Sequence, residues 1–338
     1  MSDFAWAIIG PGAIARRFAD AVHHLPGTRL HSVLGRDPAR AIAFAAHWAR
    51  DGVIPPMVAV DLASVLTDNA VDAIYIATPH SHHAEFASAC LEAGKPVLCE
   101  KPLVPNLPAA ERLVTQSREH GVFLMEALWT RFLPVYAIVG EWLREQAIGP
   151  LRAIQSSFCF NTGFNPDSRL FDPALAGGSL LDIGIYNLAM TRWVLERAQG
   201  VCPEPLSLLA DGVLSPSGVD QRVAGTVIFA DGVSAQFVCG FDGSAQNALH
   251  IYGERGYISL PQHFWEATEA VLVIAGQNAQ TAHAPFRFNG FEGEVEEAMR
   301  CIRAGLIESP MMPHGESLAL VGWIDELRRQ VGVQYPFE

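Results

Sequence analysis

The sequence predicts an α/β protein: an N-terminal domain built on a doubly wound parallel sheet is followed by an α+β domain with a mostly antiparallel sheet. Three observations predict it. Strand-like apolar runs alternate with helix-like patterns up to residue 125, a glycine-rich turn joins the first strand to the first helix, and short strands dominate after residue 150. At 338 residues the chain exceeds one comfortable core, so we expect two domains, residues 1–126 and 127–338.

The composition argues against several classes of partner. The net charge is −13 without any basic tract, so neither nucleic acid nor an anionic membrane surface is expected as a partner. The six cysteines are scattered without a Cys-x-x-Cys pair, which is typical of reduced thiols. No apolar run is long enough to span a bilayer, and no leader pattern precedes the first strand, so we expect a cytoplasmic protein.

The first strand, residues 4–9, runs directly into the turn Gly10-Pro11-Gly12-Ala13-Ile14-Ala15, and a helical pattern follows. In such a Gly-x-Gly-x-x-Ala turn the glycines permit a tight bend and let a pyrophosphate approach the main chain, where free helix amides bind it. The alternative is a glycine-rich turn that serves only close helix packing. Because the strand and the helix are both present, we expect dinucleotide binding.

The second strand, residues 28–34, ends in Gly35-Arg36-Asp37, and this end indicates which dinucleotide binds. An NAD site has a carboxylate just after the strand for the ribose hydroxyls, whereas here a glycine stands there and Arg36 suits a 2′-phosphate. Asp37 precedes Pro38 and is expected to cap the next helix. We therefore expect NADP rather than NAD; the alternative is that Arg36 is only a solvated turn residue.

A later strand, residues 71–77, ends in Thr78-Pro79-His80-Ser81-His82-His83. Three histidines so close raise the question of a metal. No cysteine or carboxylate stands at ligand spacing, so no metal site is expected. We expect instead a hydrogen-bonding role beside the cofactor for His80 or His83, because imidazole nitrogens can donate and accept.

The next strand ends in Glu100-Lys101-Pro102. An apolar run, residues 97–99, stops there at an acid, a base and a proline, on the edge where open α/β sheets bind ligands. A lysine in that place is a candidate proton carrier; the alternative is a solvated charge pair at a turn. We also expect the Lys101–Pro102 bond to be cis. A helix over residues 109–120 and a strand over residues 122–125 complete the alternation.

After residue 125 the pattern changes from alternation to mostly strands. An amphipathic helix follows Pro134 and ends near Gly149, and two helices, residues 293–304 and 315–331, close the chain. Turn pairs such as Asp231-Gly232 indicate antiparallel hairpins. The expected strands are residues 151–160, 206–213, 221–229, 233–241, 248–252, 257–260 and 270–274.

Within this second half, Gly177 and Gly178 open a helical pattern that carries Asp182 and Tyr186. Because these two residues are four apart, we expect them on one face of the helix, among apolar neighbours. A carboxylate and a phenol in such a place are candidates for proton chemistry. The alternative is a buried pair that satisfies its own hydrogen bonds.

Together these stretches resemble the glucose–fructose oxidoreductase/inositol dehydrogenase (Gfo/Idh/MocA) family over nearly the whole chain. Within the family the chain looks like the branch of dimeric dihydrodiol dehydrogenases and NADP-dependent D-xylose dehydrogenases. The motifs that carry the resemblance are the turn from Gly10 to Ala15, Ala77-Thr78-Pro79 with His83, Leu98-Cys99-Glu100-Lys101-Pro102, the run from Leu124 to Phe132, and Gly177-Gly178 through Asp182 to Tyr186.

The resemblance implies an N-terminal Rossmann domain, a doubly wound parallel sheet, followed by an α+β domain with an open, mostly antiparallel sheet. Because the second domain is often used for dimerisation in this family, we expect a homodimer or a higher homo-oligomer. It implies that Lys101 is the catalytic lysine and that Asp182 and Tyr186 complete the catalytic group. Many relatives have histidine where Tyr186 stands and asparagine where His80 stands. By the same resemblance, Thr78, Pro79, His80, His83, Glu100, Lys101 and Arg169 would lie by the cofactor, and Trp129, Phe158 and Tyr186 by the substrate.

We expect an NADP-dependent oxidoreductase that transfers a hydride between the nicotinamide and a carbinol carbon of a sugar or a vicinal cyclic diol. Lys101 or Tyr186 would take the hydroxyl proton, and Asp182 would hold one of them by a charge-assisted hydrogen bond. Trp129, Phe158 and Phe160 would form an apolar wall for a ring. Three alternatives stay open: an NADP-binding sensor without turnover, a hydrolase-like relative that uses a tightly bound cofactor transiently, and a structural assembly protein.

Overall fold

The computed structural model describes residues 3–49 and 54–338. The chain forms two compact units. The first comprises the residues up to Trp129 together with Arg287–Leu318, and the second comprises Thr130–Phe286 and Ala319–Glu338. The sequence prediction assigned everything after residue 126 to one later domain, whereas the structure returns Arg287–Leu318 to the first unit. A helical pattern shows where a helix forms but not which apolar surface its face covers, so the sequence contained no signal for this return.

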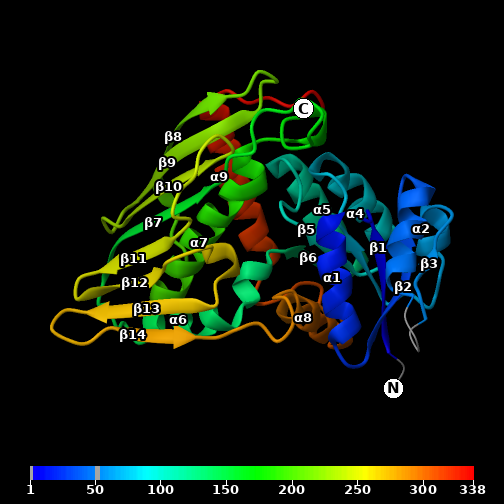
Figure 1. Ribbon diagram of the computed structural model, residues 1–338, viewed down its shortest axis with the longest axis horizontal. Helices are drawn as coiled ribbons and strands as arrows, with labels where there is room; N and C mark the ends of the chain where they lie inside the picture. The colour runs from blue at the N-terminus through cyan, green and yellow to red at the C-terminus, as the bar shows by residue number, and fades with distance from the viewer. Residues whose placement is uncertain (1–2, 50–53) are drawn as a thin grey trace. The chain divides into compact units, whose positions relative to one another are not determined.

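The described residues of the first unit form a six-stranded parallel sheet in the order β3-β2-β1-β4-β5-β6, with helices around it (Figure 1). The predicted doubly wound sheet is thereby confirmed. The strand order reverses between β1 and β4, where open α/β sheets bind their ligands. The elements are β1 (Phe4–Ile9), α1 (Ala13–His24), β2 (Thr28–Leu34), α2 (Pro38–His47), β3 (Met57–Val58), α3 (Leu62–Leu66), β4 (Ala73–Ile76), α4 (His83–Glu92), β5 (Val97–Glu100), α5 (Leu107–His120), β6 (Leu124–Ala127) and α8 (Glu292–Arg303).

The central strands are continuous apolar runs because both faces of the sheet are covered. Every residue of β1 is buried. Phe18 of α1 stacks on Tyr75 of β4 with 3.7 Å between ring centroids, and Trp6 of β1 meets Phe18 edge-on at 5.2 Å. The two-residue strand β3 was not predicted, because so short a strand has no periodicity to detect.

The described residues of the second unit form an eight-stranded sheet in the order β14-β13-β12-β11-β7-β10-β9-β8, in which β7 and β10 pair parallel and the other pairs are antiparallel. This confirms the predicted open, mostly antiparallel sheet. Helices cover one of its faces (Figure 1). The elements are α6 (Pro134–Arg144), β7 (Leu151–Cys159), α7 (Ile185–Gln199), β8 (Pro205–Leu214), β9 (Asp220–Phe229), β10 (Ser234–Gly240), β11 (Leu249–Gly253), β12 (Gly256–Leu260), β13 (Glu269–Ile274), β14 (Gln280–His283) and α9 (His314–Val331), of which residues 314–318 belong to the first unit.

The helix that carries Asp182 and Tyr186 does not begin as a regular α-helix. A π turn, Leu180–Gly184, precedes α7 and contains Asp182. A π turn closes its hydrogen bonds from i to i+5 instead of i to i+4, so the segment that carries Asp182 is wider than the predicted α-helix. Gly184 also packs tightly against β10, since a Cβ there would lie 2.8 Å from Cys239 Sγ.

Across residues 3–49 and 54–338, no helix combines the length and the apolar character needed to cross a bilayer.

Candidate active site

The glycine-rich turn after β1 has the geometry of an anion cradle. Gly10 adopts φ +96°, and a Cβ there would lie 2.7 Å from the carbonyl group of Ala77, so no other residue fits. A Cβ on Gly12 would meet no heavy atom of the described chain within 4 Å, so the space beside this residue is open. No acidic residue stands in the first turn of α1, whose N–H groups lack partners within the helix. The predicted turn from Gly10 to Ala15 therefore fits a dinucleotide pyrophosphate.

The residue that follows β2 is a glycine with no room for a side chain. A side chain at Gly35 would come within 2.8 Å of Pro11 Cγ, so the position after the strand cannot hold a carboxylate without a shift of the glycine-rich turn. Asp37 caps α2 as predicted, because its Oδ1 accepts the N–H of Ala39 at 2.9 Å. Arg36 and Arg40 are exposed, and neither guanidinium pairs with a carboxylate in the described parts of the chain.

The histidines after β4 occupy different environments. His83 is fully buried, with Nδ1 2.9 Å from the carbonyl oxygen of Pro102 and Nε2 3.0 Å from that of Thr78. Both ring nitrogens thus face main-chain carbonyls of the loops that follow β4 and β5. Burial lowers the pKa of His83 and so favours the neutral ring, which carries one N–H and donates to only one of these two oxygens at a time. His80 is buried beside it, with 5.8 Å between ring centroids.

Two further observations concern this loop. The hydroxyl of Thr78 is buried and has no hydrogen-bond partner in the described chain, so it is available to a ligand. No group of three or more possible metal-ligating side chains occurs among the described residues.

The loop after β5 holds Lys101 beside a buried acid. The Tyr75 hydroxyl donates to Oε1 of Glu100, and the main-chain N–H of Lys101 donates to Oε2 at 3.2 Å. The Lys101–Pro102 bond is cis, as predicted. A second acid, Glu294 of α8, is fully buried nearby; burial and the charge of Glu100 raise its pKa well above the usual range.

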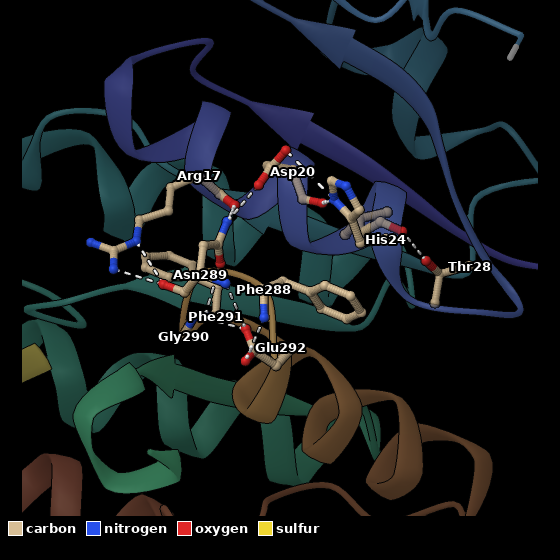
Figure 2. Close-up of polar contacts among 10 residues, drawn as sticks. Arg17, Asp20, His24, Thr28, Phe288, Asn289, Gly290, Phe291 and Glu292 are labelled. Atoms are coloured by element: carbon tan, nitrogen blue, oxygen red, sulfur yellow. Dashed lines mark hydrogen bonds and ion pairs between the residues drawn. The ribbon is translucent and has the colours of Figure 1, made fainter. Parts of the chain in front are cut away.

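Trp129 is part of the first unit, where it packs on the segment that returns from the far end of the chain. The Arg17 guanidinium lies 4.3 Å from its ring centroid, and the Phe291 ring lies 5.0 Å away. Figure 2 shows how that segment docks on α1: Nε and Nη2 of Arg17 donate to the carbonyl of Asn289 at 3.1 and 2.7 Å, and Asn289 Nδ2 donates to the carbonyl of Arg17 at 2.8 Å. The sequence prediction missed these partners because they lie far from Trp129 along the chain.

The second unit brings Asp182 together with Arg169. Nη1 of Arg169 donates to Oδ1 of Asp182 at 2.9 Å, and Asp182 is buried while Arg169 is about half exposed. The sequence prediction expected Asp182 to hold a lysine or a tyrosine and did not pair it with Arg169. Arg169 lies in a loop and Asp182 lies 13 residues later in the π turn, so no helical or strand spacing in the sequence indicates that they pair.

Tyr186 is buried at one side of a cluster of aromatic side chains. Phe158 of β7 lies 5.8 Å from it between ring centroids, and Phe160 lies 6.4 Å from Phe158. Trp265 stacks on Phe158 at 3.4 Å with almost parallel planes. The sequence prediction missed Trp265. The feature that could have indicated it is the aromatic pair Phe264-Trp265 in the connection between β12 and β13.

A buried acid supports the π turn from the sheet. Asp220 of β9 accepts the Ser179 hydroxyl at 2.8 Å and the N–H of Leu180 at 2.6 Å. Burial raises its pKa to about 6, although these hydrogen bonds lower it. Gly178 is required here, since it adopts φ +118° and a Cβ would lie 2.3 Å from Asp220 Oδ1.

The predicted site residues divide between the two units. The glycine-rich turn, Arg36, the loop from Thr78 to His83, Glu100, Lys101 and Trp129 belong to the first unit, and Phe158, Arg169, Asp182 and Tyr186 belong to the second.

Two family models match the chain. One describes an oxidoreductase family with an NAD-binding Rossmann fold (GFO/IDH/MocA) and matches residues 4–128. The other describes the GFO/IDH/MocA C-terminal domain and matches residues 136–259.

Curated relatives and solved structures match nearly the full length. A trans-1,2-dihydrobenzene-1,2-diol dehydrogenase of Danio rerio is 34% identical, covering 98% of this chain and 97% of the relative, and its Homo sapiens namesake is 32% identical, covering 98% of both. A 3-ketoreductase from Actinomadura kijaniata, solved with TDP-benzene and NADP, superposes with a TM-score of 0.81 at 25% identity and 98% coverage of both chains. An aldose–aldose oxidoreductase from Caulobacter crescentus shares the fold, with a TM-score of 0.84 at 22% identity and 97% coverage of both chains.

Proposed function

Because the chain belongs to the Gfo/Idh/MocA family of NAD(P)-dependent oxidoreductases, we propose that it oxidises a carbinol carbon of a vicinal cyclic diol or a sugar with NADP. The observation that carries the proposal lies in the first unit. The glycine-rich turn and the Lys101 loop follow β1 and β5, which flank β4 in the parallel sheet, so both stand at its carboxyl edge. The diol class is supported by the full-length similarity to dihydrodiol dehydrogenases.

The preference for NADP rests on the end of β2. Arg36 can pair with a 2′-phosphate, and the close approach of Gly35 to Pro11 leaves no place for the acid that an NAD site uses. Arg40, in the first turn of α2, is a second cation just after this loop, and it pairs with no carboxylate of residues 3–49 and 54–338. Thr78, Pro79, His80, His83, Glu100 and Arg169 complete the proposed cofactor side of the site.

Bound NADP would supply the hydride acceptor. Residues of the chain would accept the proton of the substrate hydroxyl and stabilise it. Lys101 or Tyr186 accepts the proton of the substrate hydroxyl. In this proposal Asp182, whose Oδ1 accepts from Arg169 Nη1 at 2.9 Å, supplies a negative charge that stabilises the transferred proton. Trp129 and Phe158 provide apolar surface for the ring of the substrate, with Trp265 backing Phe158.

We also propose that the protein assembles as a homodimer or a higher homo-oligomer through the face of the large sheet that lacks helices. Leu209 of β8, Ile228 of β9 and Tyr257 of β12 are exposed, and cross-strand register places Leu209 and Ile228 on the side opposite the buried Val227 and Phe229. A second copy of this chain would cover these apolar side chains. Sedimentation of the wild type and of Ile228→Glu tests this: a monomeric wild type contradicts it.

We also propose that the protein is located in the cytoplasm. The cysteines support this proposal, because none of them forms a disulfide within the described chain.

The test of the function is a screen of vicinal diols and sugars with purified protein, with NADP and with NAD, following the absorbance of the reduced nicotinamide. Turnover with a diol or a sugar, and a higher kcat/KM with NADP, is the expected result. No turnover with any substrate would favour a sensor. Cofactor that is retained through purification without net reduction would favour a hydrolase-like relative.

A further inference from the structure

The main chain immediately after Lys101 is held by buried side chains from the start of α4 and from β6. The carbonyl of Pro102 faces His83 Nδ1 at 2.9 Å. The N–H of the next residue, Leu103, donates to Glu126 Oε1 at 2.8 Å. Leu103 is itself buried, so its N–H has no access to water as a substitute partner.

Glu126 comes from β6, the strand beside β5. In the register of these two strands Glu126 stands opposite Cys99, two residues before Lys101. Its side chain is buried, and its second oxygen, Oε2, accepts the hydroxyl of Ser317 at 2.6 Å. Ser317 is buried as well and lies in the first turns of α9, within the returning segment of the first unit.

The returning segment is anchored on β6 at a second point. His314 Nε2 lies 2.9 Å from the carbonyl of Leu124, and the N–H of Leu124 donates to the carbonyl of Ile307 at 3.0 Å. Glu126 therefore connects a rigid support to the loop. One carboxylate oxygen faces this support and the other faces the main chain two residues after Lys101.

We propose that Glu126 is a positioning residue for Lys101, an inference that rests on the proposed function in so far as Lys101 handles the proton. A buried carboxylate that accepts two hydrogen bonds fixes the position of Leu103 N, and through two peptide units it fixes the Cα of Lys101. Glu126 makes no contact with substrate in this proposal. Its removal lets the loop relax and moves the lysine away from the geometry that proton transfer needs.

The experiment compares Glu126→Ala with Glu126→Gln, whose amide oxygen can still accept from Leu103. The matched control is Ser117→Ala, which removes a buried hydroxyl that donates to the carbonyl of Val122 at 2.6 Å in the same unit, away from the Lys101 loop. Steady-state kinetics over a range of pH give kcat and KM, fluorescence titration gives the Kd for NADP, and thermal melts give Tm.

Glu126→Ala should lower kcat about 100-fold, the loss that a displacement of about 1 Å causes, and should shift the pH-dependent limb of kcat. Its Kd for NADP should stay close to wild type, because the glycine-rich turn carries the pyrophosphate. Glu126→Gln should lose less than about tenfold, the difference between a charge-assisted and a neutral hydrogen bond. Ser117→Ala should lower Tm and leave kcat and the pH profile unchanged.

A second readout does not depend on turnover. The sequence contains two lysines, Lys95 and Lys101, so reductive methylation with isotope-labelled formaldehyde produces two lysine side-chain signals in NMR spectra. Lys95 is held by the carbonyls of Asp68 and Val71, and Lys95→Arg assigns its signal. The Lys101 signal should move in Glu126→Ala, whereas the Lys95 signal should not.

A wild-type kcat, pH profile and Lys101 signal in Glu126→Ala would overturn the proposal, and so would equal changes in Ser117→Ala. If Glu126→Ala does not fold, Ser317→Ala decides, because it removes the support of Glu126: an unmoved Lys101 signal in that variant would overturn the proposal. Absence of turnover in the wild type would instead contradict the proposed function, while the NMR comparison still measures the positioning of Lys101.

Discussion

Replacing Asp220 with asparagine should remove a pH dependence from the free energy of unfolding. This acid is fully buried in β9 and accepts hydrogen bonds from the Ser179 hydroxyl and from the N–H of Leu180, at the start of the turn that carries Asp182. Asparagine has nearly the same shape and keeps an oxygen acceptor for Leu180, but it cannot ionise. The substitution therefore isolates the contribution of the charge.

The size of the effect follows from the surroundings of Asp220. Burial raises the pKa of Asp220 from 3.8 to about 6. A shift of about two pKa units corresponds to about 3 kcal/mol. Because the folded protein binds this proton more tightly than the unfolded chain does, the stabilisation is fully present below the unfolded pKa and is lost as pH rises to about 6. The wild type should lose up to about 3 kcal/mol across this window, and Asp220→Asn should not.

Urea unfolding, followed by tryptophan fluorescence at several pH values between about 4 and about 7, measures the difference between the two proteins. Subtracting one curve from the other removes the groups that titrate in both. Ser179→Ala provides a second check: it removes a hydrogen bond that lowers the pKa of Asp220, so the pH window should extend upward. An Asp220→Asn protein whose stability falls with pH as steeply as that of the wild type would refute the reasoning.

Three further predictions concern cofactor, catalysis and a second buried acid. Arg36→Ala should weaken NADP binding by about 1.5–3 kcal/mol and leave NAD binding nearly unchanged; equal losses, or the same loss in the exposed control Arg112→Ala, would remove Arg36 from the phosphate site. Lys101→Met should lower turnover about 10²–10⁴-fold with a much smaller change in NADP affinity, and Tyr186→Phe should also lose rate; wild-type turnover in both variants would end the proposed proton path. Glu294→Gln should match the wild type in stability below the ordinary glutamate pKa, where Glu294 is protonated in both the folded and the unfolded protein. Because burial and the charge of Glu100 raise the pKa of Glu294 in the folded protein, the wild type alone should lose stability as pH rises from that ordinary value toward the raised pKa, which urea unfolding at a series of pH values would reveal.

Local patterns in the sequence determined much of this protein. The glycine-rich turn, the alternation of strands and helices, and the lysine at the end of β5 are all visible there, because each depends on residues that are close in the chain. Gly10 adopts a positive φ. Asp37 caps α2 by accepting the N–H of Ala39, two residues further along the chain. The cap of Asp37 and the strand–turn–helix order were therefore predictable, and the family resemblance added the roles of Asp182 and Tyr186.

Other features were decided only by the tertiary structure. Asp182 pairs with Arg169, Phe158 stacks on Trp265, and Glu126 joins Leu103 to Ser317. The return of residues 287–318 to the first unit, which brings Ser317 to Glu126, belongs with them. No periodicity links such partners, because a side-chain contact depends on where two backbones pass each other and not on the spacing between two letters. The sequence therefore determined which groups are present and on which strand ends they stand, and packing determined which of them hold one another in place.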